Sequence, residues 1–234
     1  MTEEQQNQFF EHWEDDRFYQ DQGIYRLALD LTSGLVKGDV LDLGCGSRVY
    51  YDTSSVQNWT GVDLAPRLLE NLQFLSGQAP SGELQTLQAS CLDLDLPDES
   101  FDTVCSIFLL HHLARKNRRR SLQRIEQLLS NAYRVLKLGG SMVVFESWPH
   151  VLLHLYNLSY PALYPIVQKA SGTELPYFFS ARTLAKIAAQ IGFRRRHILA
   201  VPLYETAKYP IGGFVVPGGI QPLIHKYGVY VFVK

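Results

Sequence analysis

The sequence contains little cysteine, and its cysteines follow no recognisable pattern. Cys45, Cys91 and Cys105 are the only three among 234 residues. An odd number with irregular spacing provides neither a disulfide framework nor a set of metal ligands. We therefore expect reduced thiols, no metal site and a cytoplasmic location, because the cytosol keeps thiols reduced.

Long apolar runs and an excess of charge are absent as well. No stretch reaches the roughly 18–20 apolar residues that a membrane span requires, and the polar, acidic start of the chain does not resemble a signal peptide. The formal net charge is −1, so no overall charge draws the chain to nucleic acid or to an anionic membrane. We expect a monomer or homodimer without stable membrane insertion.

What the sequence does contain is an alternation of strand-like and helix-like patterns over residues 24–146. The order is α-β-β-α-β-β-α-β, with a further helix allowed between the first two strands. Such alternation predicts an α/β fold with a doubly wound, mostly parallel sheet, in which ligands bind at the carboxyl ends of the strands. The expected strands are Asp39–Leu43, Thr60–Leu64, Leu84–Ser90, Phe101–Phe108, Ser141–Glu146, His197–Leu203 and Gly228–Val233, and the expected helices cover Ile24–Leu31, Ala65–Leu75, Leu122–Leu136 and Ser180–Gln190.

Three segments lie outside this alternation, within what we expect to be a single domain over residues 1–234. Residues 1–23 predict a helical amino-terminal arm that carries aromatic side chains. Residues 147–180 are rich in aromatics and predict a helical cap insertion above the sheet. Residues 204–227 predict a long loop, and the last two strands predict an antiparallel pair that closes the sheet.

The most sharply defined stretch is Val40–Ser47, a buried strand followed by glycines at 44 and 46. A dinucleotide fingerprint would need a third glycine where Val49 stands, and the Gly-Lys-Ser/Thr of a P-loop is absent. Asp63 ends the next strand, where a carboxylate can accept both hydroxyls of a ribose. Asp42 adds negative charge beside the turn. These residues predict an adenosine-type ligand that carries an ammonium or sulfonium group and no pyrophosphate.

Five motifs in this order resemble those of Rossmann-like, class I S-adenosylmethionine-dependent methyltransferases, most of all the small-molecule methyltransferases of ubiquinone and menaquinone biosynthesis. The resemblance implies a methyltransferase with S-adenosylmethionine as cofactor and a small-molecule acceptor, largely apolar or aromatic. The motifs are Val40–Ser47, Gly61–Leu64, Leu96–Val104, Leu110–Leu113 and Arg134–Gly140.

The resemblance also implies roles for individual residues. The turn at Gly44, Cys45 and Gly46 would lie against the methionine part of the cofactor, with Asp42 near its ammonium group and Asp63 on its ribose. The remaining cofactor-binding residues implied are Leu64, Ser90, Cys91 and Leu92 around the adenine, Ser106 and Ile107 beside the methyl donor, and Tyr19 and Tyr25 closing over the cofactor.

Two positions depart from the family pattern. The family usually has Asp-Ala where this chain has Ser90-Cys91, so Asp93 or backbone contacts are alternative ways to hold the adenine. A glycine often stands where this chain has Arg48, which is expected to point outward or to meet the carboxylate of the cofactor.

Candidate catalytic residues are His112, as a base, and Glu146, which ends the fifth strand at the active edge. The alternatives are a structural role for the histidine and an N-cap or surface position for the glutamate. The substrate would lie under the cap, where ring-bearing side chains suit an apolar or aromatic acceptor. The substrate-binding residues we expect are His112, Trp148, Tyr156, Tyr160 and Tyr177.

Other patterns favour less specific interpretations. His150 and His154 lack a third metal ligand. The basic run Arg115–Arg120 precedes an amphipathic helix, so a solvated helix start is expected and no nucleic-acid partner. The apolar stretch Val151–Val167 leaves peripheral membrane association open, although it has few basic residues. A cofactor-binding but catalytically idle module is the alternative to an enzyme.

Overall fold

The computed structural model describes residues 22–113, 118–149, 157–159, 162–163, 165–166, 169, 179–201, 208–211, 214–217 and 225–234. The helices are α2 (Gln22–Thr32), α3 (Pro66–Glu70), α4 (Arg118–Val135) and α6 (Ala181–Ile191), with a 3-10 helix η1 (Leu110–Leu113). The strands are β1 (Gly38–Leu43), β2 (Arg48–Val49), β3 (Val56–Asp63), β4 (Gln73–Phe74), β5 (Leu84–Gln88), β6 (Phe101–Ile107), β7 (Leu136–Pro149), β8 (Arg194–Val201), β9 (Lys208–Ile211), β10 (Phe214–Pro217) and β11 (His225–Val233).

Within this described part, seven strands form one sheet in the order β5-β3-β1-β6-β7-β11-β8. The five strands from β5 to β7 are parallel, whereas β11 runs antiparallel to both β7 and β8. The chain passes from β1 outward to β3 and β5 and then returns to β6 on the other side of β1. This reversal creates a topological switch point between β1 and β6, where open α/β sheets bind ligands.

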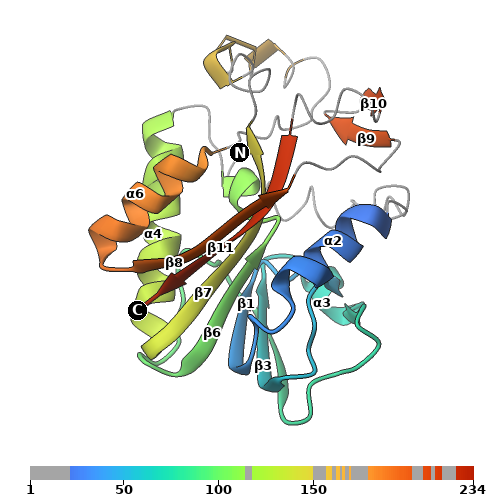
Figure 1. The fold of residues 1–234 in the computed structure, drawn as a ribbon, viewed down its shortest axis with the longest axis vertical. Coiled ribbons are helices and arrows are strands. Elements are labelled where there is room, and N and C mark those ends of the chain that lie inside the picture. The colour runs from blue at the N-terminus through green and yellow to red at the C-terminus, as the bar shows by residue number, and fades with distance from the viewer. Residues whose placement is uncertain are drawn as a thin grey trace.

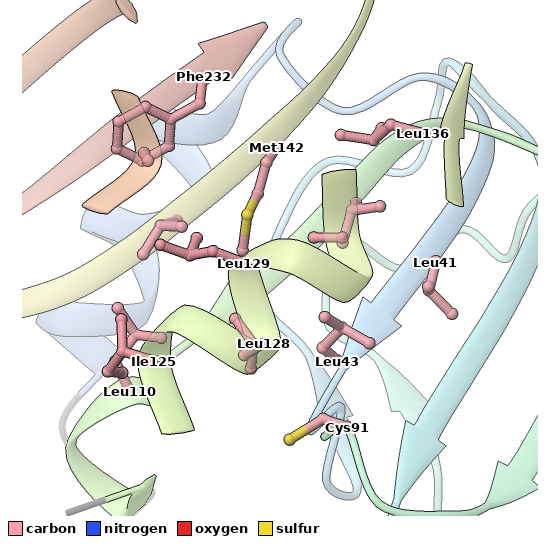
Figure 2. Packing of buried hydrophobic residues seen from close by; sticks show 14 of the residues in the cluster. Leu41, Leu43, Cys91, Leu110, Ile125, Leu128, Leu129, Leu136, Met142 and Phe232 are labelled. Atoms are coloured by element: carbon pink, nitrogen blue, oxygen red, sulfur yellow. The ribbon is translucent and has the colours of Figure 1, made fainter. Parts of the chain in front are cut away.

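Helices cover both faces of the sheet (Figure 1), and each face has its own core. On the face of α4 and α6, Ile125, Leu128 and Leu129 are fully buried against Met142 and Phe232 (Figure 2). Complete burial of each such side chain stabilises the fold by about 1.5–3 kcal/mol. The other face packs beneath α2. The predicted α/β sheet with its closing antiparallel strands is therefore confirmed.

The helix α6 lies within one residue of the predicted Ser180–Gln190 at both ends. The Ser180 hydroxyl accepts a hydrogen bond from the backbone N–H of Thr183 at 3.2 Å, which satisfies one of the helix's unpaired amino-terminal donors. Gly192 follows the last turn with φ of 123°, a conformation that L side chains rarely adopt. The apolar face of α6 buries Leu184 and Ala188.

The helix allowed between the first two strands does not form. Residues 44–55 run instead as an extended connection that contains β2, and β3 already begins at Val56, four residues before the predicted strand. Val49, Tyr51 and Thr53 are buried at every second position. This is the period of a strand, and it explains why the segment cannot present a helical apolar face.

The helix predicted over Ala65–Leu75 ends after five residues, at Glu70. The following residues pair with β2, since the backbone N–H groups of Gln73 and Leu75 donate to the carbonyls of Ser47 and Val49. Those donors are needed to continue a helix, so the long-range pairing overrides the helical spacing of the leucines.

The strand β7 begins at Leu136, five residues before the predicted strand. Its pairing with β6 shifts register between Phe101, which lies opposite Leu136, and Thr103, which lies opposite Ser141. Gly139 lies in the shifted stretch with φ of 79°, the left-handed conformation expected of a glycine here.

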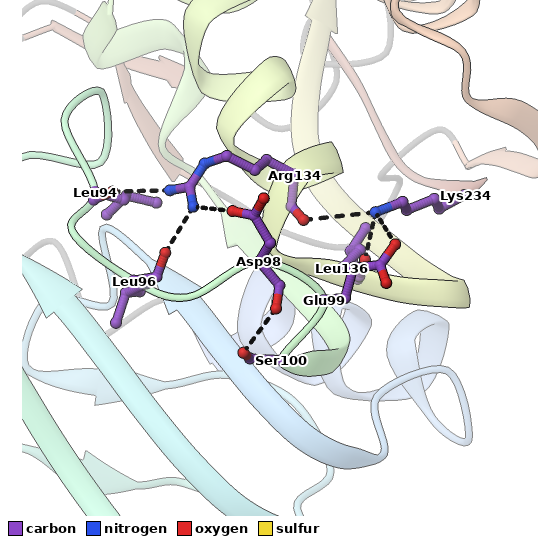
Figure 3. A network of polar contacts seen from close by, with 8 residues as sticks. All are labelled: Leu94, Leu96, Asp98, Glu99, Ser100, Arg134, Leu136 and Lys234. Carbon is purple, nitrogen blue, oxygen red and sulfur yellow. Dashed lines mark hydrogen bonds and ion pairs between the residues drawn. The ribbon is translucent and has the colours of Figure 1, made fainter.

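A polar network ties the acidic loop before β6 to the carboxyl end of α4 (Figure 3). The guanidinium of Arg134 donates to the carbonyls of Leu96 and Leu94 at 2.6 and 2.8 Å, and to the Asp98 carboxylate at 2.6 Å. Lys234 joins Glu99 to the start of β7 through the carbonyl of Leu136. The loop is therefore fixed from two sides.

Among the residues that the structure describes, none of the helices is both long enough and apolar enough to cross a membrane. Most of the proposed amino-terminal arm and of the cap over 147–180 lies outside the described residues. The stretch 204–227, predicted as a loop, contains β9 and β10, which pair antiparallel, and the first residues of β11, so it is not a continuous loop.

Candidate functional site

The glycine turn lies at the carboxyl end of β1, beside the switch point. Gly44 and Gly46 have φ of 66° and 59°, which only glycine adopts without strain. The backbone N–H groups of Gly44 and Cys45 both donate to the carbonyl of Val62 in β3, at 2.8 and 3.2 Å. The turn is thereby anchored to the neighbouring strand.

The two glycines face different surroundings. A Cβ added to Gly46 would meet nothing within 4 Å, whereas one added to Gly44 would lie 2.5 Å from a methyl group of Leu109. The space beside Gly46 can therefore accept a ligand close to the backbone, and Leu109, which follows β6, packs against the other side of the turn.

Asp63 is held against this turn by two backbone donors. Its Oδ2 accepts from the N–H of Gly46 at 2.9 Å, and its Oδ1 accepts from the N–H of Ala65 at 3.0 Å. These bonds fix the carboxylate at the carboxyl end of β3 next to the open glycine. The contact of Asp63 with a ribose stays a prediction.

Asp42 lies in β1 immediately before the turn, and its side chain is almost fully buried. The hydroxyl of Tyr51 donates to its Oδ2 at 2.9 Å, and the indole N–H of Trp59 donates to the oxygen of Tyr51 at 2.7 Å. Burial raises the pKa of Asp42 to about 7, the Tyr51 hydrogen bond opposes this rise, and the charge of Asp63 adds to it. A cation placed nearby would favour the ionised carboxylate.

The thiols near the turn are not reactive groups. Cys45 and Cys105 are buried, and burial raises the pKa of both well above the usual range, with the charge of Asp42 as a further cause. Cys91 is also buried, and none of the three forms a disulfide in the described part of the chain.

The segment predicted to surround the adenine follows β5. The Ser90 hydroxyl accepts from the N–H of Leu92 at 3.3 Å, so it holds its own loop. The carbonyl of Leu92 accepts from Gln127 and Asn131 of α4, each at 2.8 Å. Cys91 and Leu92 are buried while Asp93 is exposed. Leu64, partly buried, follows β3.

Ser106 and Ile107 end β6, and both are buried. The Ser106 hydroxyl has no hydrogen-bond partner among the residues that the structure describes. Arg48 lies in β2 opposite Gln73 and is partly buried, just beyond the glycine turn.

The two candidate catalytic residues have different surroundings from those expected. Glu146 is neither exposed nor isolated: its side chain is 2% exposed, and its Oε1 lies 2.9 Å from Nδ1 of His111. Its Oε2 accepts the backbone N–H of the same histidine at 3.4 Å. Burial lowers the pKa of His112 well below its usual value, and the charge of His111 lowers it further. The surface position considered for Glu146 is therefore wrong.

Several predicted site residues cannot be placed. Tyr19, Tyr156, Tyr160 and Tyr177 lie outside the described residues, and only the backbone of Tyr25 and Trp148 is described. No group of His, Cys, Asp or Glu in the described ranges could hold a metal ion.

No sequence pattern points to Tyr51, Trp59 or Leu109, whose contacts depend on how the chain folds. At the paired histidines 111 and 112 the sequence favours His112. His111 belongs to the Leu110–Leu113 motif, and its ring Nδ1 lies within hydrogen-bond distance of the Glu146 carboxylate.

Comparison with known proteins points to methyltransferases. Residues 41–144 match the family model described as a methyltransferase domain. The chain is 26% identical to a ubiquinone/menaquinone biosynthesis C-methyltransferase of Geotalea daltonii over 63% of each chain. It is 30% identical to a tRNA (carboxymethyluridine(34)-5-O)-methyltransferase of Arabidopsis thaliana over 57% of this chain and 29% of that protein. The chain thus spans less than two thirds of the length of these relatives.

A solved structure has the same fold. That structure is of a SAM-dependent methyltransferase from Thermotoga maritima, described as a possible histamine N-methyltransferase. It aligns with a TM-score of 0.63 and 19% identity, over 97% of this chain and 99% of its own. At this identity the similarity concerns the fold.

Proposed function

Because this chain carries a methyltransferase domain of the class I, S-adenosylmethionine-dependent type, we propose that it transfers a methyl group from S-adenosylmethionine to a small, largely apolar or aromatic acceptor. The observation that carries the proposal is the pair of acids at the glycine turn. Asp63 is bonded to the N–H of Gly46, and Asp42 is buried beneath the same turn.

The residues present fit this cofactor. The open backbone at Gly46 admits the methionine part, and Asp63 faces it with the acceptor oxygens that ribose hydroxyls need. Asp42 offers a partner to the ammonium group. The further contacts proposed are those of Gly44, Cys45, Leu64, Ser90, Cys91, Leu92, Ser106 and Ile107, with Tyr19 and Tyr25 closing over the cofactor.

The cofactor supplies an activated methyl group on a positively charged sulfur. The protein aligns donor and acceptor, and such alignment can supply about 7–11 kcal/mol of the barrier reduction. The anchored turn between β1 and β3 fixes the donor side. The ends of β6 and β7 lie next in the sheet and form the edge over which an acceptor would lie.

The acceptor class rests on the aromatic residues of the segment 147–180 and on the quinone-methylating relative. Trp148, Tyr156, Tyr160 and Tyr177 are proposed to line its pocket. The three buried cysteines, which form no disulfide among the described residues, are compatible with a cytoplasmic enzyme, which we include in the proposal.

Isothermal titration with S-adenosylmethionine and with its demethylated product tests the proposal. Both are expected to bind, and Asp63→Asn is expected to weaken both by about tenfold or more, since hydrogen bonds to a charged group contribute about 1.5–3 kcal/mol. The exposed Asp95→Asn is the matched control with the smaller expected effect. Absence of binding by either compound to the wild type would contradict the proposal.

Two alternatives make different predictions. A catalytically idle module would bind the cofactor and transfer no methyl group to any acceptor.

An RNA acceptor is favoured by the tRNA-methylating relative and by the exposed arginines 118–120 at the start of α4. Salt-dependent binding of unmodified tRNA, with a tenfold loss on replacing these arginines, would support the RNA alternative.

A further inference from the structure

We propose that His111 is the general base of the reaction, positioned by Glu146, and that the acceptor therefore bears a proton on its nucleophilic group, as a phenol or hydroquinone does. This inference rests on the proposed methyltransferase function and deepens it. It also replaces His112, the residue that the sequence pattern favours, with its neighbour.

The Glu146 carboxylate contacts both the backbone and the ring of His111. Glu146 accepts from the backbone N–H of His111 through Oε2 and contacts Nδ1 of the ring through Oε1, at 3.4 and 2.9 Å. Both contacts join η1 to β7, and the second also fixes the orientation of the imidazole.

The contact with Glu146 also sets the tautomer. An ionised carboxylate can only accept hydrogen bonds, so Nδ1 of His111 carries the proton. The ring's lone pair then resides on Nε2, the nitrogen that takes a proton in a carboxylate–histidine pair.

Charge supports the same assignment. When His111 gains a proton, the buried carboxylate of Glu146 compensates the new positive charge at hydrogen-bond distance. The ring of His112 lies with its centroid 4.0 Å from that of His111. Burial keeps His112 neutral, so the rings do not form a repelling pair of cations.

Position completes the argument. His111 lies in the turn after β6 and Glu146 in β7, and the His111 side chain is 15% exposed whereas Glu146 is 2% exposed. In the sheet order, β6 lies directly beside β1, and Leu109, two residues before His111, would contact a Cβ added to Gly44. His111 therefore lies at the same carboxyl edge of the sheet as the glycine turn.

The chemistry balances without a further reactant. Nε2 of His111 takes the hydroxyl proton, and the electron pair left on oxygen, or on the ring carbon conjugated to it, forms the new bond to the methyl carbon. The carbon–sulfur bond breaks with its electron pair going to sulfur, which becomes neutral. For attack from carbon, the ring carbon then loses its own proton, which restores aromaticity, and the oxygen regains a proton from His111, so either route releases one proton per turnover.

The first test is nitrogen-15 NMR of histidine-labelled protein saturated with the demethylated cofactor. Two-bond proton–nitrogen correlations distinguish the tautomers. His111 is expected to be protonated on Nδ1 in the wild type, and Glu146→Gln is expected to reduce that fraction severalfold. The exposed Glu83→Gln is the matched control and should leave it unchanged. A wild-type ring protonated on Nε2 overturns the inference.

The second test uses 1,4-naphthohydroquinone and a series of substituted 2-naphthols as acceptors, with labelled cofactor. His111→Asn keeps a donor toward Glu146 but has no basic nitrogen. It should lower kcat about 10²–10⁴-fold for acceptors protonated at the assay pH. The loss should shrink toward tenfold or less for naphthols that are already ionised.

The outcomes separate this inference from the proposed function. An equal loss across the naphthol series would indicate a structural role for His111, and an unchanged kcat would exclude it as the base. In both cases cofactor binding measured by titration would still support a methyltransferase. Failure of the wild type to bind the cofactor would instead contradict the function itself.

Discussion

The hydroxyl of Tyr51 donates a hydrogen bond to the carboxylate of Asp42 across 2.9 Å, in the interior beneath the glycine turn. The two residues are joined by the extended connection that replaces the expected helix. Because Trp59 donates to Tyr51 in turn, the turn rests on a buried polar chain of three side chains. Burial raises the pKa of Asp42, the acid of this chain, to about 7.

Asp42→Asn should alter how stability depends on pH. The pKa of Asp42 is raised in the folded state from 3.8 to about 7, so folding favours its protonated form. Its contribution to stability is therefore fully present below about pH 4 and lost as the pH rises through 7. That loss is on the order of 4 kcal/mol. Urea unfolding at pH 5 to 8 should show a shallower decline for Asp42→Asn, and the exposed Asp95→Asn should follow the wild type.

Cofactor binding should release a proton near neutral pH. A cationic ligand near Asp42 favours its ionised form, so affinity for S-adenosylmethionine should rise about tenfold per pH unit below pH 7 and level off above it. Calorimetry in buffers of different ionisation enthalpy measures the released proton directly. Asp42→Asn should bind more weakly and without this pH dependence; a wild-type affinity that is constant from pH 6 to 8 would contradict the expected contact.

Gly44→Ala should destabilise the protein more than Gly46→Ala. Both place a Cβ at positive φ, which costs roughly 1 kcal/mol. Only at Gly44 does the new atom also meet Leu109, at 2.5 Å. Overpacking of this kind typically adds 1–3 kcal/mol. In the double variant with Leu109→Ala, urea unfolding should show part of the Gly44→Ala loss recovered, and strict additivity would count against the contact.

Arg134→Ala should loosen the acidic loop before β6. The substitution removes the donors to the carbonyls of Leu94 and Leu96, and hydrogen bonds from a charged group contribute about 1.5–3 kcal/mol. We expect a loss of about 2 kcal/mol in unfolding free energy and faster hydrogen exchange over residues 93–100. Arg134→Lys should lie between, since one ammonium cannot span all three acceptors. Arg120→Ala, exposed at the start of α4, is the control.

Helices whose apolar residues recur at a regular spacing were predictable from the sequence. The helix α6 matches its cap residues at both ends, and the buried face of α4 follows the 3.6-residue spacing of Ile125, Leu129 and Ala132. Errors occurred where a local preference competes with distant pairing. The leucines after Pro66 have helical spacing, yet the N–H of Gln73 donates to Ser47 and the helix stops at Glu70.

For the candidate site, the sequence by itself determined the sharp turn at Gly44 and Gly46, the acids at Asp42 and Asp63, and the order of strands that brings them to one edge. These depend on backbone conformation and on period, which are properties of neighbouring residues. Only the tertiary structure decided that Tyr51 would bind Asp42 and that Glu146 would hold His111, 35 residues away in the chain. Burial and hydrogen-bond partners set the charge and tautomer of such groups, and both arise only when distant strands and turns pack together.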